Sequence, residues 1–510
     1  MTADRLARAH GLRAAGQGAA AERDCQGILA QAPDHPDALN LLGILTMERG
    51  DLVAGMALVE RSNRAAPSAE KGYNLGLAAE RLGDAAGAEA WYRQAVALDP
   101  RAAAAHNNLG VLLMERGDPA AGRHFDLALT ADPGHHRAWI NRGSLWRQAG
   151  RRLEAGQALQ HALALAPDDP VARFNLGLLR LQQGDLAAGF RDYAWRYASG
   201  QVPLPPIRER PWNGEAPAGR VLLVQAEQGY GDTLNFLRFL HPLRRLGPRE
   251  IHVTCPPPLG RLLAGFPAID RLLAPGDPLP RFDWQVSLHD LPRLLGVTTM
   301  ADLDMAGPGP TVDPALVARW RERVSGPAGR RVGLVWRGRA DFAHDRFRSL
   351  SAARVAPLLV RRDIRFHGLV KEPAPGEMDC LTAQPNFTDL GPELADFADT
   401  AAVMTHLDLI ITTDTAAAHL AGTLLRPTWL LLGFDPDWRW FLEREDSPWY
   451  PTLRLLRQPV PGDWETVLTR VERGLETLRP TDLKQIDPVL EKGDGTGQVL
   501  PVKDVEEFLS

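Results

Sequence analysis

Apolar positions in residues 1–200 fall into helical stretches that come in pairs, and the pairs recur every 33 or 34 residues. The period is marked by one series of prolines and two series of glycines: Pro33, Pro67, Pro100, Pro133 and Pro167; Gly50, Gly83, Gly117, Gly150 and Gly184; Gly43, Gly76, Gly110, Gly143 and Gly177. Registers that share one period predict an array of structural repeats rather than a single globular core.

Each unit of this array predicts two helices. In the unit that ends at Pro100, Gly83 breaks the first helix and the proline ends the second. The small residues Gly76 and Ala88 allow the two helices to approach closely. The pattern resembles tetratricopeptide repeats over residues 4–198. This resemblance implies an α-solenoid, in which units stack because none of them buries its apolar face alone.

A polar position recurs in the same array. Two residues before a glycine of the first helix stand four asparagines: Asn74, Asn108, Asn141 and Asn175. In tetratricopeptide repeats this position lies on the inner, concave helix. The resemblance therefore implies a ladder of amides that hydrogen-bonds the backbone of an extended acceptor peptide. The alternative is that each amide bonds only to its neighbours, and the sequence leaves both open.

After Tyr197 the pattern changes to short apolar runs separated by helical stretches. Seven runs are typical of buried strands: 220–226, 251–255, 284–288, 332–336, 364–370, 407–413 and 428–432. Strands that alternate with helices predict parallel sheets with crossover helices. Ligands of such sheets bind beyond the carboxyl ends of the strands, so the residues that follow each run are the candidates for a site.

Stretches rich in Pro and Gly divide this half of the chain. Residues 199–219 are expected to be a linker, and the break at 325–329 separates two comparable α/β blocks, 220–324 and 330–478. The last helix of the second block is expected to pack back over the sheets. The polar tail, 480–510, is expected to be mobile. The predicted fold class is α + α/β.

The stretch I-I-T-T-D-T-A-A-A-H-L-A-G ends an apolar strand and begins a helix. The first amides of a helix lack intrahelical partners and carry partial positive charge. Ala416 and Ala417 have almost no side chain, so an anion has room to reach these amides. We therefore expect a phosphate site beside Asp414 and Thr415. The alternative is that Asp414 or Thr415 only caps the helix.

A second turn, A-E-Q-G-Y-G-D-T-L, follows the first strand of the α/β half. Gly229 and Gly231 allow a tight turn, and Asp232 lies where a helix starts. The turn differs from a dinucleotide-binding fingerprint because Leu234 replaces the third glycine, and prolines rather than an acid follow the second strand. A nicotinamide-dependent enzyme is therefore not expected. The sequence also contains no P-loop.

Together the two turns resemble the heptosyltransferase-type glycosyltransferases of family 9, over residues 212–478. The resemblance implies a GT-B pair of Rossmann-like domains that transfers a sugar from a nucleotide-activated donor with inversion at the anomeric carbon. It implies the role of general base for Asp232. It implies donor contacts for a second set of residues: Gly229, Gly231, Asp414, Thr415, Ala416, Ala417 and His419. Relatives have a glycine where this chain has Ala416.

The same resemblance implies a basic contact to the donor phosphates after the first strand of the second block. Arg348 aligns best with it, and Arg337 is second. An arginine binds phosphate through two hydrogen bonds and stabilises a leaving diphosphate; the alternative is a solvated loop charge. Trp438 and Trp440 lie in an aromatic loop, which is expected either to wall the nucleotide or acceptor pocket or to be pinned to the repeats.

Composition narrows the class of protein further. The 510 residues are 45% apolar and 24% charged with a net charge of −5, which gives no electrostatic basis for nucleic-acid binding. Three well-separated cysteines argue against a disulfide framework and against a zinc site. No stretch suits a signal peptide or a membrane helix, so we expect a cytoplasmic chain without membrane insertion.

No metal and no bound cofactor are expected. The loose Asp-x-Asp triplets at 302–304 and 435–437 are of a kind that arises by chance, and a helix N-terminus with an arginine neutralises a diphosphate without a metal.

The leading hypothesis is an inverting glycosyltransferase that uses a nucleotide sugar as co-substrate and recruits a protein acceptor through its repeats. Similar bacterial proteins, in which tetratricopeptide repeats precede such a domain, include enzymes that modify flagellin, so flagellin is a candidate acceptor. The alternative is a non-catalytic scaffold or adaptor with a degenerate transferase fold. The sequence does not identify the sugar, the nucleotide, the acceptor or the oligomeric state.

Overall fold

The computed structural model describes residues 2–303, 307–326, 329–339 and 345–477. The chain forms two compact units. The first, called the repeat unit here, contains Met1–Arg180 and Arg191–Pro203; the second, called the α/β unit, contains Leu181–Phe190 and Leu204–Ser510. The tail that is expected to be mobile lies outside the described residues.

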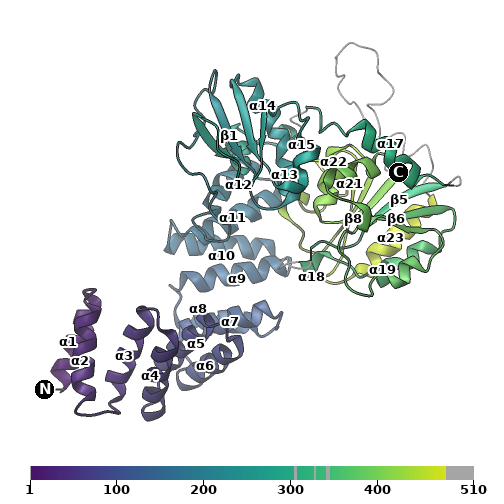
Figure 1. Ribbon diagram of the computed structural model, residues 1–510. Helices are drawn as coiled ribbons and strands as arrows, with labels where there is room; N and C mark the ends of the chain where they lie inside the picture. Colours follow the sequence, from purple (N-terminus) through teal and green to yellow (C-terminus); the bar gives the residue numbers. More distant parts are fainter. Residues whose placement is uncertain (1, 304–306, 327–328, 340–344, 478–510) are drawn as a thin grey trace. The chain divides into compact units, whose positions relative to one another are not determined.

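The repeat unit is built from antiparallel helix pairs (Figure 1). The helices of the array are α1 (Thr2–Ala14), α2 (Gly18–Leu29), α3 (Pro36–Glu48), α4 (Leu52–Ala65), α5 (Ala69–Arg81), α6 (Ala85–Leu98), α7 (Ala103–Glu115), α8 (Ala121–Ala131), α9 (His136–Gln148), α10 (Arg152–Leu165), α11 (Pro170–Gln183) and α12 (Leu186–Tyr193). From α2 to α8, the second helix of each pair also packs on the first helix of the next pair, which produces the predicted solenoid of stacked repeats.

The two glycine series of the repeats do different things. Where a first helix ends, the chain takes a left-handed conformation, with φ of 78° at Gly83 and 74° at Gly117, which glycine adopts without steric cost. Within the first helix, glycine lets the partner helix come close. A Cβ atom at Gly76 would lie 2.3 Å from Cε1 of Tyr92. The regular spacing of glycines in the sequence therefore reflects turns and close helix contacts that recur from repeat to repeat.

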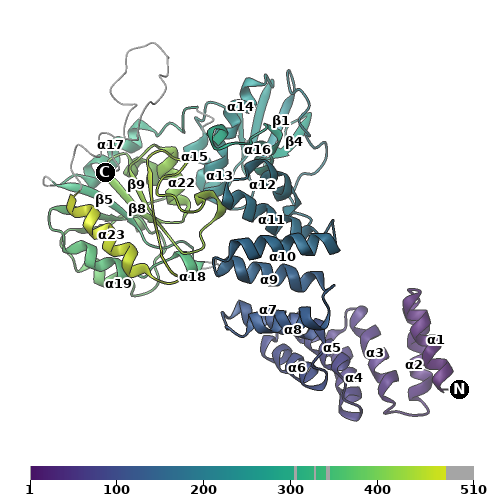
Figure 2. The same ribbon diagram turned by 180° about the vertical axis from the view of Figure 1, so that it is seen from behind.

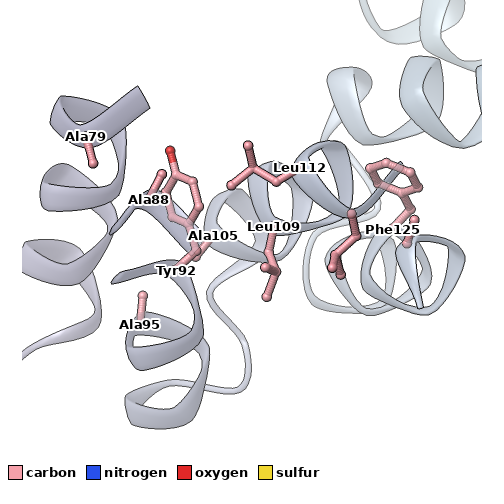
Figure 3. Close-up of a cluster of buried hydrophobic side chains, with 10 residues drawn as sticks. Ala79, Ala88, Tyr92, Ala95, Ala105, Leu109, Leu112 and Phe125 are labelled. Carbon is pink, nitrogen blue, oxygen red and sulfur yellow. The ribbon is translucent and has the colours of Figure 1, made fainter. Parts of the chain in front are cut away.

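Neighbouring repeats share one apolar core, shown in Figure 3. Leu109 and Leu112 of α7 lie between the rings of Tyr92 from α6 and Phe125 from α8. Both rings are fully buried, so each repeat covers the apolar face that its neighbour leaves open.

The α/β unit contains two parallel sheets. Its strands are β1 (Val221–Gln225), β2 (Glu250–Thr254), β3 (Arg271–Leu273), β4 (Trp284–Ser287), β5 (Arg330–Val335), β6 (Ile364–Gly368), β7 (Phe387–Asp389), β8 (Leu409–Thr413), β9 (Thr428–Leu432) and β10 (Leu453–Arg457). The first sheet has the order β3-β2-β1-β4 and the second β10-β9-β8-β5-β6-β7. All strand pairs are parallel, as the alternation of strands and helices predicts.

The seven predicted strands are all present, but the sequence reading missed β3, β7 and β10. β3 and β7 are three residues long and only partly buried, so they carry no apolar run. β10 contains two arginines among three leucines and lies at the edge of the second sheet. Edge strands need only one apolar face, which weakens the signal that identifies central strands.

Helices lie around both sheets (Figures 1 and 2). They are α13 (Tyr230–Phe236), α14 (Leu240–Arg245), α15 (Gly260–Leu263), α16 (Leu291–Leu294), α17 (Pro314–Val324), α18 (Asp345–Arg348), α19 (Ala352–Val355), α20 (Asp379–Thr382), α21 (Phe397–Met404), α22 (Ala416–Thr423) and α23 (Trp464–Thr477). The last of these packs on β10 and buries Val467 and Val471, as expected. Gly474 of α23 lies against the ring of Trp429 in β9.

Each sheet has one point at which the direction of its strand order reverses. In the first sheet β1 lies between β2 and β4, and in the second β5 lies between β6 and β8. Crossover helices leave the sheet on opposite faces at such a point, so the carboxyl ends of these central strands are where ligands of open α/β sheets bind. Helices α13 and α22, which follow β1 and β8, pack against each other. The carboxyl ends of β1 and β8, at the two switch points, are therefore brought close together by the contact of these helices.

Candidate functional site

The first switch point presents Asp232 at the start of α13. Gly229 is the N-cap residue, and its N–H donates to Oδ2 of Asp232 over 2.9 Å. The preceding residue, Gln228, has a φ of 63°, a left-handed conformation that is uncommon for a side chain of this size. The carboxylate is 24% exposed, so one of its oxygens is fixed in the turn while the group still reaches solvent.

His289 lies at the same switch point, just after β4. Its Nε2 is 3.8 Å from Oδ1 of Asp232, and its Nδ1 is 3.3 Å from Oε1 of Glu227, which follows β1. The ring packs on Phe236 with centroids 4.4 Å apart and is buried. The imidazole thus stands between two carboxylates. Sequence reasoning missed this residue.

Arg439 approaches Asp232 from the aromatic loop after β9. It lies in the short 3-10 helix η8 (Trp438–Trp440), and its Nη2 donates to Oδ1 of Asp232 over 2.5 Å. Its Nη1 donates to Asp437 over 2.9 Å, and its Nε donates to Asn235 over 3.3 Å. The guanidinium is buried and lies over the ring of Trp438. Sequence reasoning missed this residue as well.

These contacts set the charge of Asp232. Burial alone raises the pKa of this carboxyl. The charge of Arg439 opposes burial, and the nearby imidazole of His289 also lowers the pKa, so the pKa of Asp232 ends well below its ordinary value. The carboxylate is ionised at neutral pH and is a very weak base in this state.

The second switch point has the strand-turn-helix that the sequence predicts. β8 ends at Thr413, Thr415 is the N-cap residue, and α22 begins at Ala416. Among the described residues, no side chain makes a capping hydrogen bond to the first turn of this helix. The hydroxyl of Thr415 lies 3.3 Å from that of Thr412 instead. The simple capping alternative therefore lacks its hydrogen bond.

Arg348 and Asp414 lie together at this point. Nη1 of Arg348 donates to the backbone oxygen of Asp414 over 2.8 Å, which brings a guanidinium to the first turn of α22. Burial, reinforced by the nearby charge of Asp437, raises the pKa of Asp414 above its ordinary value. Ala416 and Ala417 are partly exposed. The first amides of a helix in partly exposed residues, a guanidinium and a carboxyl that resists ionisation are together suited to an anion.

Arg337 is in a different environment. Its Nη1 donates to Glu377 over 2.7 Å, and Nε1 of Trp336 donates to the other oxygen of the same carboxylate over 3.1 Å. Arg337 therefore helps to hold the loop after β5, and Arg348 is the one of the two that reaches Asp414.

His419 of α22 is buried at the contact between α22 and α13. Its ring stacks on Trp440 with centroids 5.1 Å apart, and its Nδ1 lies 3.0 Å from the hydroxyl of Tyr450. Burial lowers the pKa of His419 to about 3, helped by the charge of Arg439, so the ring is neutral at physiological pH. A Cβ atom at Gly231 would lie 2.6 Å from Cδ2 of His419 and 3.3 Å from Cα of Ala416. The glycine is thus where α13 and α22 touch.

The aromatic loop is packed into the α/β unit. Trp438, Trp440, Trp449 and Tyr450 are all buried. Trp438 makes an edge contact with Trp449 at 5.9 Å and another with Phe190 at 5.8 Å, a residue of the segment Leu181–Phe190. Their rings form a buried cluster rather than an exposed aromatic surface, and Trp438 packs against the guanidinium of Arg439.

The four asparagines of the repeat unit are partly exposed, and three of them bond to neighbouring side chains. Asn108 donates to the hydroxyl of Tyr92 over 3.1 Å, and Asn141 donates to Asn107 over 2.9 Å. Asn175 makes a longer contact of 3.5 Å with Ser144. Local bonding therefore occurs at three of the four amides.

No group of three or more His, Cys, Asp and Glu side chains is arranged to hold a metal ion within the part of the chain that the structure describes. Asp302 accepts from the backbone N–H groups of Thr298 and Thr299, and Asp437 pairs with Arg439. Among these same residues, a helix with the length and apolarity to cross a bilayer is absent.

Comparison with known proteins gives three kinds of likeness. The tetratricopeptide repeat family model matches residues 6–70, 73–136 and 119–170. Protein FlbA of Caulobacter vibrioides is 28% identical over 507 residues, covering 90% of this chain and 82% of that protein. Among solved structures, MamA is 24% identical with a TM-score of 0.29 over 31% of this chain and 94% of its own. YrrB, a tetratricopeptide protein with an unusual peptide-binding site, is 22% identical with a TM-score of 0.29 over 33% and 88%. The family model and the packed helix pairs together show that the N-terminal part of the chain is an array of tetratricopeptide repeats, and a unit of parallel sheets follows it in the sequence.

Proposed function

We propose that the α/β unit is an inverting glycosyltransferase of the GT-B type, related to glycosyltransferase family 9. The observation that carries the proposal is the contact between the two switch points. Gly231, next to Asp232, lies against Ala416 and His419 at the start of α22. A base on one sheet thus faces an anion-binding helix end on the other, which is the arrangement that direct displacement at a sugar carbon needs.

In this proposal the nucleotide sugar lies with its diphosphate against the first amides of α22 and the guanidinium of Arg348. Asp232 accepts the proton of an acceptor hydroxyl. The acceptor oxygen then bonds to the anomeric carbon as the bond from that carbon to the phosphate oxygen breaks, and the nucleoside diphosphate leaves with the electron pair. Positive charge at the helix end stabilises the leaving group, so no metal is required.

The repeat unit is proposed to bind the protein acceptor, for which flagellin is a candidate. The partly exposed asparagines Asn74, Asn108, Asn141 and Asn175 are proposed to hydrogen-bond the backbone of an extended segment. A binding unit on the same chain as the enzyme raises the local concentration of acceptor. Binding through the backbone would allow acceptors of different sequence.

The experiment titrates UDP, GDP, ADP and CMP against the thermal unfolding midpoint of the full chain. A nucleotide that binds the folded state raises the midpoint, by an amount that grows with its concentration. Absence of a response to all four would favour the alternative, a scaffold or adaptor with a degenerate transferase fold.

A variant then separates binding from chemistry. Asp232→Asn keeps the size of the side chain but removes its capacity as a base, so it should bind the nucleotide no more weakly than wild type and lose transfer by about 10²–10⁴-fold. Full activity in this variant would exclude Asp232 as the base. Mass spectrometry of flagellin and other surface proteins, from cells with and without the chain, would identify the acceptor and the mass of the sugar.

A further inference from the structure

We propose that Arg439 couples donor binding to the basicity of Asp232: in the donor-free protein it occupies the carboxylate, and the donor diphosphate draws its guanidinium away. This inference rests on the proposed function of the same site. It makes Arg439 a positioning residue that prevents proton transfer until the donor is bound.

The first support is that both oxygens of Asp232 are engaged. Oδ2 accepts the N–H of Gly229, and Oδ1 accepts Nη2 of Arg439 with Nε2 of His289 also close by. An acceptor hydroxyl must donate its proton to an oxygen of this carboxylate. The oxygen that is not fixed in the turn, Oδ1, already accepts from the guanidinium. The same contact depresses the pKa of Asp232, so the carboxylate that is ionised is also too weak a base to take a proton from an alcohol.

The second support is the position of Arg439 between the two switch points. The next residue, Trp440, stacks on His419 inside α22 with ring centroids 5.1 Å apart, which places Arg439 beside that helix. The charge of Arg439 also acts on both Asp414 and His419. A diphosphate against these amides would come within reach of the guanidinium. It carries more negative charge than one carboxylate and accepts two hydrogen bonds from arginine. The donor is therefore the stronger partner.

The third support is that Arg439 has a second carboxylate. Nη1 donates to Asp437, and the guanidinium lies over the rings of Trp438 and Phe236. These contacts allow Nη2 to leave Asp232 without the buried charge losing all its partners, a loss that would be costly. Phe441, directly after η8, has φ 52° and ψ −161°, a strained conformation of the kind that is found at sites with two states.

The test measures the dissociation constant of the stabilising nucleoside diphosphate for three proteins by calorimetry at fixed salt. In wild type, binding must break the Arg439–Asp232 ion pair. Asp232→Asn removes that competing charge, so the nucleotide should bind about tenfold more tightly, in the usual range of coupling between two linked contacts. The matched control is Asp437→Asn, which removes the other carboxylate on the same guanidinium. That contact persists in the proposed complex, so the gain there should stay below about threefold.

The outcomes are distinct. Unchanged or weaker binding by Asp232→Asn overturns the coupling while nucleotide binding itself stands. Equal tightening by both variants also overturns it, because the effect is then only the loss of a nearby negative charge. Binding of no nucleotide by any of the three proteins defeats the proposed function and this inference together.

A second pair of variants tests Arg439 directly. Arg439→Lys retains the charge but loses the planar fork, and Arg439→Met loses both, so affinity should fall in that order. If Arg439→Met proves unfolded by circular dichroism, the comparison of Asp232→Asn with Asp437→Asn still decides the question. Folded Arg439→Met with wild-type affinity would overturn the proposal.

Discussion

Gly231 controls, at the scale of single residues, how closely the ends of the two sheets approach. The space where its Cβ would lie is taken by the ring of His419 and the backbone of Ala416. Both neighbours are held: the ring is stacked on Trp440, and the backbone belongs to a helix. A larger residue has no flexible side chain to displace here.

We expect Gly231→Ala to lower the free energy of unfolding by about 1–3 kcal/mol, the usual cost of overpacking. The matched control is Gly260→Ala at the start of α15, where φ is −55° and nothing lies within 4 Å of the added atom. That change should leave stability within about 1 kcal/mol of wild type, on the stabilising side. Urea denaturation of both variants measures the difference; equal midpoints would show that the interface between α13 and α22 adapts.

The residues of the site differ in how far the sequence predicts their positions. Asp232 and Thr415 belong to turns between a strand and a helix, so the local pattern predicts where they lie relative to the sheet. Arg439 contacts a carboxylate 207 positions away in the sequence, and no local pattern encodes that pairing. His289 follows a predicted strand, but its importance depends on that strand lying beside β1, and strand order is not visible in the sequence.

At the scale of elements, one buried carboxylate ties three helices together. Asp399 of α21 accepts from Arg261 of α15 over 2.7 Å and from Nε1 of Trp320 in α17 over 2.8 Å. Arg319 of α17 lies 3.3 Å away. Asp399 itself is almost completely buried, whereas both arginines are largely exposed. One side chain therefore contacts residues of both other helices.

Asp399→Ala should lower the free energy of unfolding by about 2–4 kcal/mol, because the indole N–H of Trp320 is left buried without an acceptor. The exposed arginines recover hydration, which keeps the loss below that of a fully buried ion pair. The control is Asp313→Ala, which removes only the N-cap of α17 and should cost about 1 kcal/mol. Chemical denaturation measures both, and similar losses would mean that Asp399 acts only as a local contact.

The sequence predicts helices and strands well where a single regular pattern of residues determines them. The repeats have fixed glycines for turns and for helix contacts, and the central strands are continuous apolar runs. The short edge strands β3 and β7 lack this pattern because their stability comes from one neighbour and not from their own apolar residues.

At the scale of the whole molecule, the boundary between the units does not follow the boundary between the sequence patterns. The repeat pattern continues through α12, yet Leu181–Phe190 belongs to the α/β unit. Within that unit, Nε2 of Gln182 donates to Oδ1 of Asp435 over 3.2 Å and to the backbone oxygen of Pro436 over 3.1 Å. Phe190 packs on Trp438, next to Arg439. The sequence gives no sign of this, since these residues keep the repeat period.

A fragment that begins at residue 204 should therefore be less stable than one that begins at residue 168, which retains α11 and α12. We expect a thermal midpoint lower by about 5 °C or more, because the buried face of Trp438 loses its cover and the backbone oxygen of Pro436 loses its donor. The shorter fragment should also bind the nucleotide more weakly, since the loop that carries Arg439 is less well held. Equal midpoints and affinities for the two fragments would contradict this role of the segment.

The placement of Leu181–Phe190 also bears on how such chains can be recombined. An array borrowed from another protein would have to leave Leu181–Phe190 in place, because these residues belong to the same compact unit as the sheets. Upstream repeats are free to be lengthened, shortened or replaced. Repeats can thus be exchanged while Leu181–Phe190 stays with the sheets.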